Sequence, residues 1–182
     1  MKRSEINTAV RNAMKAFRAH GWILPPNPKW DVTDFGLGNF KKYGLTLVNL
    51  TEEPEYCEKI MFVMKGQITP RHYHKSKKED IICRWGRLAI RLFGRTKTLD
   101  VKINGEVRRI LANQPIILKA GERITLPQRL PHEFWAVSSY AIVGEVSTAN
   151  DDLHDNFFAD RRIGRFSKIE EDEKPIVKLV SD

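Results

Sequence analysis

Cysteine and long apolar runs are scarce in this sequence of 182 residues, and each scarcity excludes a class of protein. Only two cysteines occur, Cys57 and Cys83, which are too few for a disulfide framework and suit a reducing compartment. No apolar run approaches the roughly 20 residues that a bilayer crossing requires, and the N-terminus lacks the apolar core of a signal peptide. We therefore expect a cytoplasmic protein with no membrane partner.

Acidic residues are the minority charge, because 23 Asp and Glu face 31 Lys and Arg, which leaves a net charge of +8. A surplus of this sign can attract nucleic acids or phosphorylated ligands. The basic residues are scattered in short groups, as on a solvated surface, and they do not interleave with aromatic residues. We expect no nucleic-acid partner. The content of 41% hydrophobic and 30% charged residues is that of a folded globular protein.

The order of the segments predicts an all-β domain that follows one helix. Residues 4–20 have apolar side chains at helical spacing, with Ser4 as a candidate N-cap and Gly21 just past the end. From residue 44, β-branched and aromatic runs alternate with turn signals, and Asn104-Gly105 is a strong type I′ hairpin signal. We expect three parts: a helix with a proline-rich connection, a closed or two-sheet β domain, and a polar tail packed on it, over residues 1–29, 30–166 and 167–182.

A histidine-rich segment and a distant fourth histidine predict a metal site. His72 and His74 are two residues apart, so both rings project from one face of a strand, and a Lys/Ser-rich turn lets Glu79 return on the next strand. A proline-bounded turn places His132 at the start of an apolar strand. We expect His72, His74, Glu79 and His132 to hold one divalent cation; imidazole and carboxylate ligands together accept manganese, iron, cobalt, nickel or zinc.

Two charged residues in apolar strands are further candidates. Glu145 lies in an otherwise apolar run, where burying an acid without a purpose costs several kcal/mol. Lys59 alternates with Cys57 and Met61, so its amine is expected to point inward. The alternatives are a structural ion pair for Glu145 and, for Lys59, a side chain that extends to the rim of the barrel.

The histidine-rich segment matches the cupin motif G-x5-H-x-H-x4-E-x6-G at every specified position, from Gly66 to Gly86. The second cupin motif is matched around His132, with Arg129 and Ala136 where that motif has glycine and asparagine. The chain therefore resembles the cupin superfamily. This resemblance implies a double-stranded β-helix, or jelly-roll, barrel.

Longer segments narrow the resemblance to the D-lyxose isomerase family over roughly residues 30–166; they include YCEKIMFVMKGQITPRHYHKSKKEDIICRWG, DFGLGNFKKYGL, LPHEFWA and GEVSTANDDLHDN. The resemblance implies a metal-dependent aldose–ketose isomerase. Such an enzyme interconverts D-lyxose and D-xylulose, and often D-mannose and D-fructose, through a cis-enediol or enediolate, with manganese as the usual metal.

The resemblance also implies roles for individual side chains. Glu145 is the first candidate for the acid–base group, and Lys59 for a substrate contact that also polarises a sugar hydroxyl. The acid-rich segment after residue 150 is expected to close over the pocket and to contribute an acid; Asp160 is the candidate for catalysis and Asp155 for substrate binding.

Two aromatic residues that directly follow His132 are candidates for the sugar-binding wall. Successive side chains of a strand alternate between its faces, so one of Phe134 and Trp135 is expected to face the cavity, with plain core packing as the alternative for either. No phosphate-cradling loop occurs. We therefore favour an unphosphorylated pentose or hexose as substrate.

Two other functions fit a cupin with these ligands. A dioxygenase would use the same three histidines and glutamate around iron, and a non-catalytic sugar-binding module would bind without turnover. By analogy with other cupins, and because the N-terminal helix and the exposed strand edges would suit a partner subunit, we also expect a homodimer.

Overall fold

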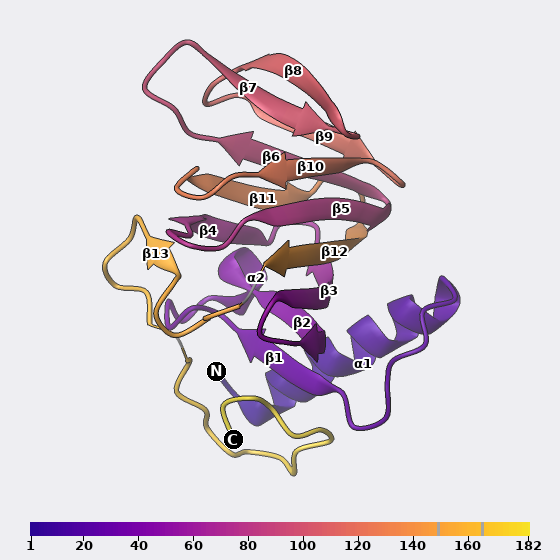
Figure 1. Ribbon diagram of the computed structural model, residues 1–182. Helices are drawn as coiled ribbons and strands as arrows, with labels where there is room; N and C mark the ends of the chain where they lie inside the picture. Colours follow the sequence, from indigo (N-terminus) through magenta and orange to yellow (C-terminus); the bar gives the residue numbers. More distant parts are fainter. Residues whose placement is uncertain (149, 165) are drawn as a thin grey trace.

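The computed structural model describes residues 1–148, 150–164 and 166–182. Within them, strands form two antiparallel sheets (Figure 1). The larger sheet has the order β1-β2-β3-β12-β5-β10-β7-β8, with bounds Lys29–Thr33, Leu45–Glu52, Tyr56–Met64, Tyr140–Thr148, Glu79–Trp85, Arg123–Leu126, Thr98–Ile103 and Glu106–Leu111. The smaller sheet has the order β13-β4-β11-β6-β9, with bounds Phe157–Phe158, Ile68–Tyr73, His132–Ala136, Arg87–Leu92 and Pro115–Lys119. The all-β expectation is confirmed.

The central strands of the larger sheet are buried on both faces. In β3, Met61 and Val63 belong to the core between the two sheets, whereas Ile60 and Phe62 belong to a second core under helix α1 (Arg3–Ala19). This double burial explains why β3 and β12 are almost continuous apolar runs rather than alternating ones. A charged residue that points from these strands into the barrel must therefore find its partners there.

Helix α1 covers the outer face of the larger sheet (Figure 1). It ends at Ala19, and Gly21 follows with a φ of 75°, as expected for a residue just past a helix. The N-cap prediction is wrong, because the cap residue is Lys2 and the hydroxyl of Ser4 donates to Asp172 instead. A second helix, α2 (Phe40–Tyr43), precedes β2.

The chain after residue 166 packs largely against α1. The buried guanidinium of Arg3 forms ion pairs with Glu171 at 2.6 Å and Asp182 at 2.9 Å. The apolar piece at 176–180 forms one isolated bridge, from Leu179 to Trp30 of β1, rather than a strand. In the described part of the chain, no helix has the length and apolar content that a membrane crossing requires.

The sharpest turn prediction is confirmed. Asn104 and Gly105 join β7 to β8 with φ values of 54° and 84°, both positive as a type I′ turn requires.

Candidate active site

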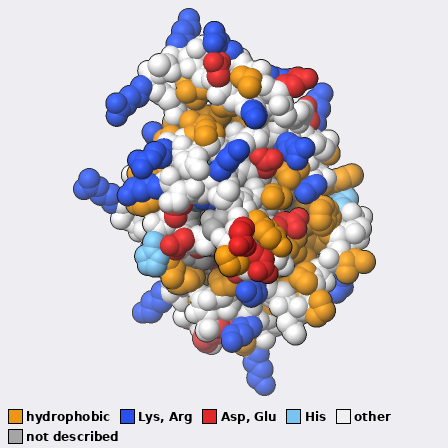
Figure 2. All heavy atoms as spheres, viewed as in Figure 1, with side chains coloured by type: hydrophobic (Ala, Val, Ile, Leu, Met, Phe, Trp, Pro, Cys, Tyr) orange, Lys and Arg blue, Asp and Glu red, His pale blue; other side chains and the backbone are white. Residues whose placement is uncertain are grey.

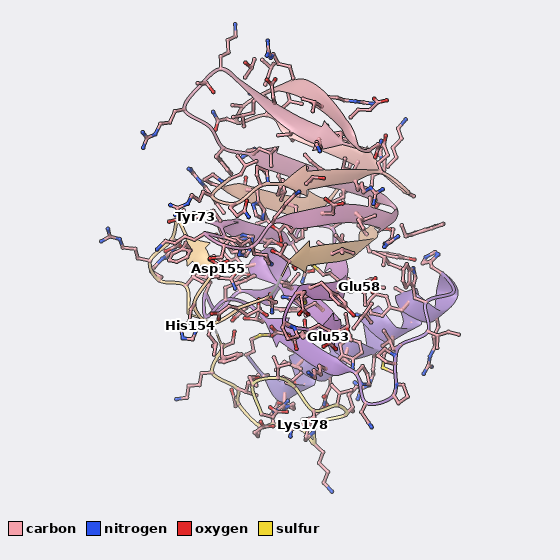
Figure 3. The ribbon with its side chains drawn as sticks, viewed as in Figure 1. Glu53, Glu58, Tyr73, His154, Asp155 and Lys178 are labelled. Atoms are coloured by element: carbon pink, nitrogen blue, oxygen red, sulfur yellow. The ribbon has the colours of Figure 1, made fainter. Side chains whose placement is uncertain are left out.

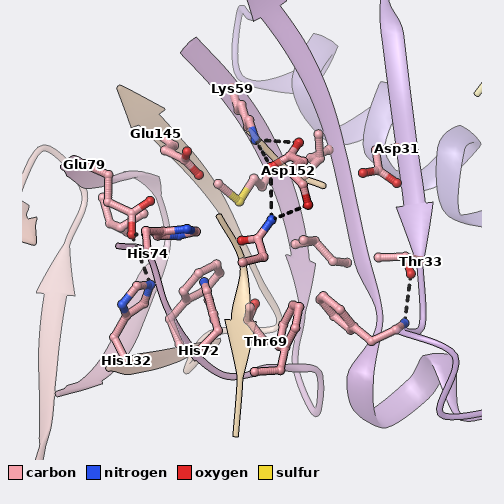
Figure 4. Close-up of a pocket in the computed structure, with 18 of the residues that line it drawn as sticks. Asp31, Thr33, Lys59, Thr69, His72, His74, Glu79, His132, Glu145 and Asp152 are labelled. Atoms are coloured by element: carbon pink, nitrogen blue, oxygen red, sulfur yellow. Dashed lines mark hydrogen bonds and ion pairs between the residues drawn. The ribbon is translucent and has the colours of Figure 1, made fainter. Parts of the chain in front are cut away.

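Three buried histidines converge inside the barrel. His72 lies near the end of β4, directly opposite His132 at the start of β11, and His74 follows β4 by one residue. One ring nitrogen from each histidine lies within 4.8 Å of the others. Figure 4 shows the three rings grouped beside Glu79 at one end of a pocket. The spacing of two residues and the proline-bounded turn thus bring together side chains that are 60 residues apart.

Backbone carbonyls fix the tautomer of each ring. The Nδ1 atoms lie 2.8, 2.7 and 3.0 Å from the carbonyl oxygens of Pro70, Asp155 and Leu130, for His72, His74 and His132 in turn. A carbonyl only accepts, so each Nδ1 carries the proton and each Nε2 keeps a free lone pair. Burial lowers the pKa of His72 well below its ordinary value and that of His74 in the same direction, which keeps both rings neutral.

Glu79 completes a set of inward-facing acceptors. Its Oε1 lies 3.5 Å from Nε2 of His74 and 3.1 Å from Nε2 of His132. These three atoms are buried and have no hydrogen-bond partner among the residues that the structure describes. Buried acceptors that face one another without a donor are costly, unless a cation lies between them. The three imidazoles are therefore compatible with a divalent metal ion, and the carboxylate of Glu79 lies beside two of them.

A buried lysine joins the metal-ligand candidates to Glu145. Nζ of Lys77 lies 2.8 Å from Oε1 of Glu145 and 3.2 Å from Oε2 of Glu79. Burial works to lower the pKa of Lys77, but these two carboxylates raise it above its usual value. Burial likewise opposes ionisation of Glu79, and the ammonium of Lys77 holds the pKa of that carboxyl well below its usual range. Two carboxylates and one ammonium leave one net negative charge at this end of the cavity, which favours a dication.

From the sequence alone, Lys77 was only one residue of a Lys/Ser-rich turn, and its place in the cavity was not predicted. The available signal was its spacing, because Lys77 lies two residues before Glu79 and so shares its direction on an extended chain. The carboxylate of Glu145 also lies where the sequence placed it, inside the barrel. It is directly opposite Lys59 in the pairing of β12 with β3.

The rest of the cavity is lined by both polar and apolar side chains (Figure 4). Nζ of Lys59 donates to Asp152 at 3.0 Å and to Asn150 at 2.9 Å, and Asn156 donates to the carbonyl oxygen of Asp152 at 2.9 Å. The other described lining residues outside the metal-ligand cluster are Asp31, Thr33, Phe35, Leu45, Leu47, Met61, Thr69, Ile81, Phe134, Phe158 and Gly164. Figure 2 shows acidic side chains beside a hollow in the middle of the face that it presents.

The structure places three of the predicted substrate and catalytic residues outside the cavity lining. Trp135 turns to the outer face of its sheet, under the guanidinium of Arg91, because Phe134 takes the inward position. Asp160 forms an ion pair with Arg162 at 2.7 Å. The carboxylate of Asp155 accepts backbone N–H groups of a neighbouring turn. Asp152, which was not singled out, is the acid that the post-150 segment directs into the pocket.

The first of the two departures from the second cupin motif places a non-glycine residue in a strained backbone conformation. Arg129 adopts a φ of 63°, the left-handed conformation for which the cupin motif has glycine. Its backbone N–H donates to the carbonyl of His74 at 2.6 Å, so the turn keeps its shape despite the substitution. The last glycine of the first motif is needed, because a Cβ on Gly86 would lie 2.6 Å from the carbonyl oxygen of Tyr140.

Comparison with known proteins identifies the family. The family model described as D-lyxose isomerase matches residues 27–182. The chain belongs to the D-lyxose isomerase family. A D-lyxose/D-mannose isomerase from Escherichia coli O157:H7 is 37% identical over 223 aligned positions, which span all of this chain and 98% of that protein. A D-lyxose ketol-isomerase from Cohnella laeviribosi is 31% identical and covers 95% of this chain and 100% of its own length.

Solved structures support the cupin fold of this family member. An L-ribose isomerase from Cellulomonas parahominis, in complex with L-ribose, superposes with a TM-score of 0.73. That comparison covers 93% of this chain and 98% of the other, at 18% identity. The family and the fold that the motifs predicted are therefore both confirmed.

Proposed function

We propose that the protein is a metal-dependent aldose–ketose isomerase that interconverts D-lyxose and D-xylulose, and also D-mannose and D-fructose. The observation that carries the proposal is the joining of Glu145 to the metal-ligand candidate Glu79 through Lys77, within one cavity of a chain from this family. An acid–base carboxylate and a cation site are the two groups that proton transfer next to a carbonyl needs.

The cation would be held by Nε2 of His72, His74 and His132 and by Oε1 of Glu79. When bound, it supplies positive charge that polarises the sugar carbonyl and stabilises an enediolate. We propose manganese as the native ion; iron, cobalt, nickel and zinc suit the same ligands. Restoring activity to chelated protein with each ion in turn tests this choice.

Glu145 is the group that moves the proton. Its carboxylate removes the proton from C2 of the aldose and returns it to C1, while the hydroxyl proton of O2 passes to O1. Lys77 holds Oε1 of Glu145 at 2.8 Å and fixes the direction of the carboxylate. Because the same ammonium contacts Oε2 of Glu79, the base and the metal-ligand cluster keep one relative position.

The polar side chains of the cavity bind the remaining hydroxyls of the sugar. Lys59, Asp152 and Asn156 offer both donors and acceptors, and Phe134 and Phe158 supply apolar surface for the carbon chain. Among the described lining residues, both lysines are engaged with carboxylates, so neither is set aside for a phosphate. This supports an unphosphorylated sugar.

An isomerase assay on chelated and metal-restored protein tests the function. The expected result is conversion of D-lyxose to D-xylulose only when the metal is restored. A metal-restored protein that leaves every aldose unchanged but consumes oxygen would support the dioxygenase alternative, which the polar cavity disfavours. Sugar binding without turnover, unaffected by Glu145→Gln, would support a binding module.

The homodimer remains a proposal. The apolar side of α1 is occupied by the larger sheet, so it does not serve a partner. The support lies instead in exposed apolar side chains on the edge strands of the two sheets, Val107 and Leu111 on β8 and Ile117 on β9. The molar mass in solution, measured by light scattering before and after Val107→Lys, tests it.

A further inference from the structure

Asp155 makes contacts that a solvated loop residue would not make. It is 8% exposed, and its carboxylate lies against the turn that follows the metal-ligand strand β4. Oδ1 accepts the backbone N–H of Lys75 at 2.7 Å, and Oδ2 accepts that of Lys77 at 2.9 Å. The N–H of Ser76 lies 3.1 Å from both oxygens. Three successive N–H groups thus form an anion-binding nest that this carboxylate fills.

The same residue holds a metal-ligand candidate. The backbone carbonyl of Asp155 accepts Nδ1–H of His74 at 2.7 Å, which leaves Nε2 of that ring as the inward acceptor. The turn that the carboxylate caps also carries Lys77, whose ammonium contacts Glu79 and Glu145. One residue therefore fixes a histidine of the cluster and the lysine that orients the base.

The chain around Asp155 is tied to β4 over several residues. Phe157 and Phe158 of β13 pair with Tyr73 and His72, and the N–H of Ala159 donates to the carbonyl of Arg71. Figure 3 labels Asp155 next to β13, at this edge of the smaller sheet. Strand β13 is an added edge strand on β4, which carries His72. Asp155 lies just before β13 in the chain.

We propose that Asp155 is a positioning residue for the metal cluster and for Lys77, rather than a group that contacts the sugar. Its carboxylate sets the 75–77 turn, and its carbonyl sets the His74 ring. The role of Lys77 in catalysis rests on the proposed function, whereas the effect on the metal cluster does not.

The test is Asp155→Asn, which keeps the shape and the carbonyl but replaces one acceptor oxygen by an amide that cannot accept from the turn. The matched control is Asp151→Asn on the same loop, because Asp151 is half-exposed and caps only Leu153 and His154. Mn²⁺ affinity is measured on metal-free protein by competition with a chromogenic chelator. We expect Asp155→Asn to weaken Mn²⁺ binding roughly 10- to 100-fold, and Asp151→Asn to change it less than twofold.

Turnover separates positioning from simple destabilisation. At saturating Mn²⁺ and at a temperature where both variants are folded, Asp155→Asn should lower kcat for D-lyxose with KM within twofold. Mn²⁺ affinity within twofold of the unmodified protein would overturn the inference. If the unmodified protein does not turn over D-lyxose, the proposed function fails, but the affinity comparison still decides this inference.

One measurement needs no variant. In the unmodified protein, the amides of Lys75, Ser76 and Lys77 should exchange with deuterated solvent at least tenfold more slowly than in an unstructured peptide. Exchange at the peptide rate would show that the nest is not formed, and it would overturn the inference even if Asp155→Asn does not fold.

Discussion

Replacing Glu145 by Gln tests whether this carboxylate is the base of the isomerase reaction. The amide oxygen of Gln still accepts from Lys77, which lies 2.8 Å from Oε1 of Glu145, and Lys77 keeps its ion pair with Glu79 at 3.2 Å. The change therefore removes the base and little else. General-base catalysis contributes roughly 10²- to 10⁴-fold, so we expect kcat to fall by that factor, about 3 to 5 kcal/mol of barrier.

The other parameters separate base removal from damage to the site. Since Glu145 is not in the ligand set, Mn²⁺ affinity should stay within about threefold, which is less than 1 kcal/mol. Lys77 then donates to a neutral amide rather than to a carboxylate, which should lower the free energy of unfolding by about 1 to 3 kcal/mol. The matched control is Glu133→Gln, because Glu133 stands next to His132 but turns to Arg91 on the outer face, 3.0 Å away. If kcat of the fully metal-loaded Glu145→Gln variant falls by less than threefold, the assignment of the base is refuted.

Four further predictions follow from particular contacts. Removal of the metal by a chelator should lower the melting temperature by several degrees, because the buried acceptors then face one another with no cation between them. A melting curve that does not depend on metal would contradict the site. Lys59→Gln removes the ion pair with Asp152, so KM for D-lyxose should rise about tenfold with a smaller change in kcat; a loss confined to kcat would instead place Lys59 in the chemistry. Arg129→Gly relieves the positive φ and should raise the free energy of unfolding by about 1 kcal/mol in urea titrations; a decrease would contradict a strained turn. Burial raises the pKa of Cys57 and Cys83 to about 11, so both should resist alkylation at pH 8 until the protein is denatured; rapid labelling of the folded protein would show exposed thiolates.

The elements set by local sequence were predictable. The Asn104-Gly105 hairpin depends on two residues that tolerate positive φ, and the α1 boundary depends on Gly21. The grouping of the histidines with Glu79 was also predictable, because the strand period of two points His72 and His74 in one direction and a single turn leads to Glu79 on the facing sheet.

The features that the sequence did not predict correctly depend on contacts between distant segments. Ser4 has the side chain of an N-cap, but Asp172 of the C-terminal tail takes its hydroxyl. The acids after residue 150 look alike in sequence, and three-dimensional contacts assign them: Asp152 to Lys59, Asp155 to a backbone nest, and Asp160 to Arg162. No local pattern encodes which partner each acid meets.

In the proposed function, a buried carboxylate moves a proton between neighbouring carbons of an open sugar beside a metal site. Proton NMR of D-xylulose formed from D-lyxose in D₂O tests it directly, because a proton carried by a carboxyl group exchanges with solvent. We expect deuterium at C1 of D-xylulose, which should form only when the metal is present and more slowly in Glu145→Gln. D-xylulose that forms without any deuterium at C1, or no D-xylulose at all, would contradict it.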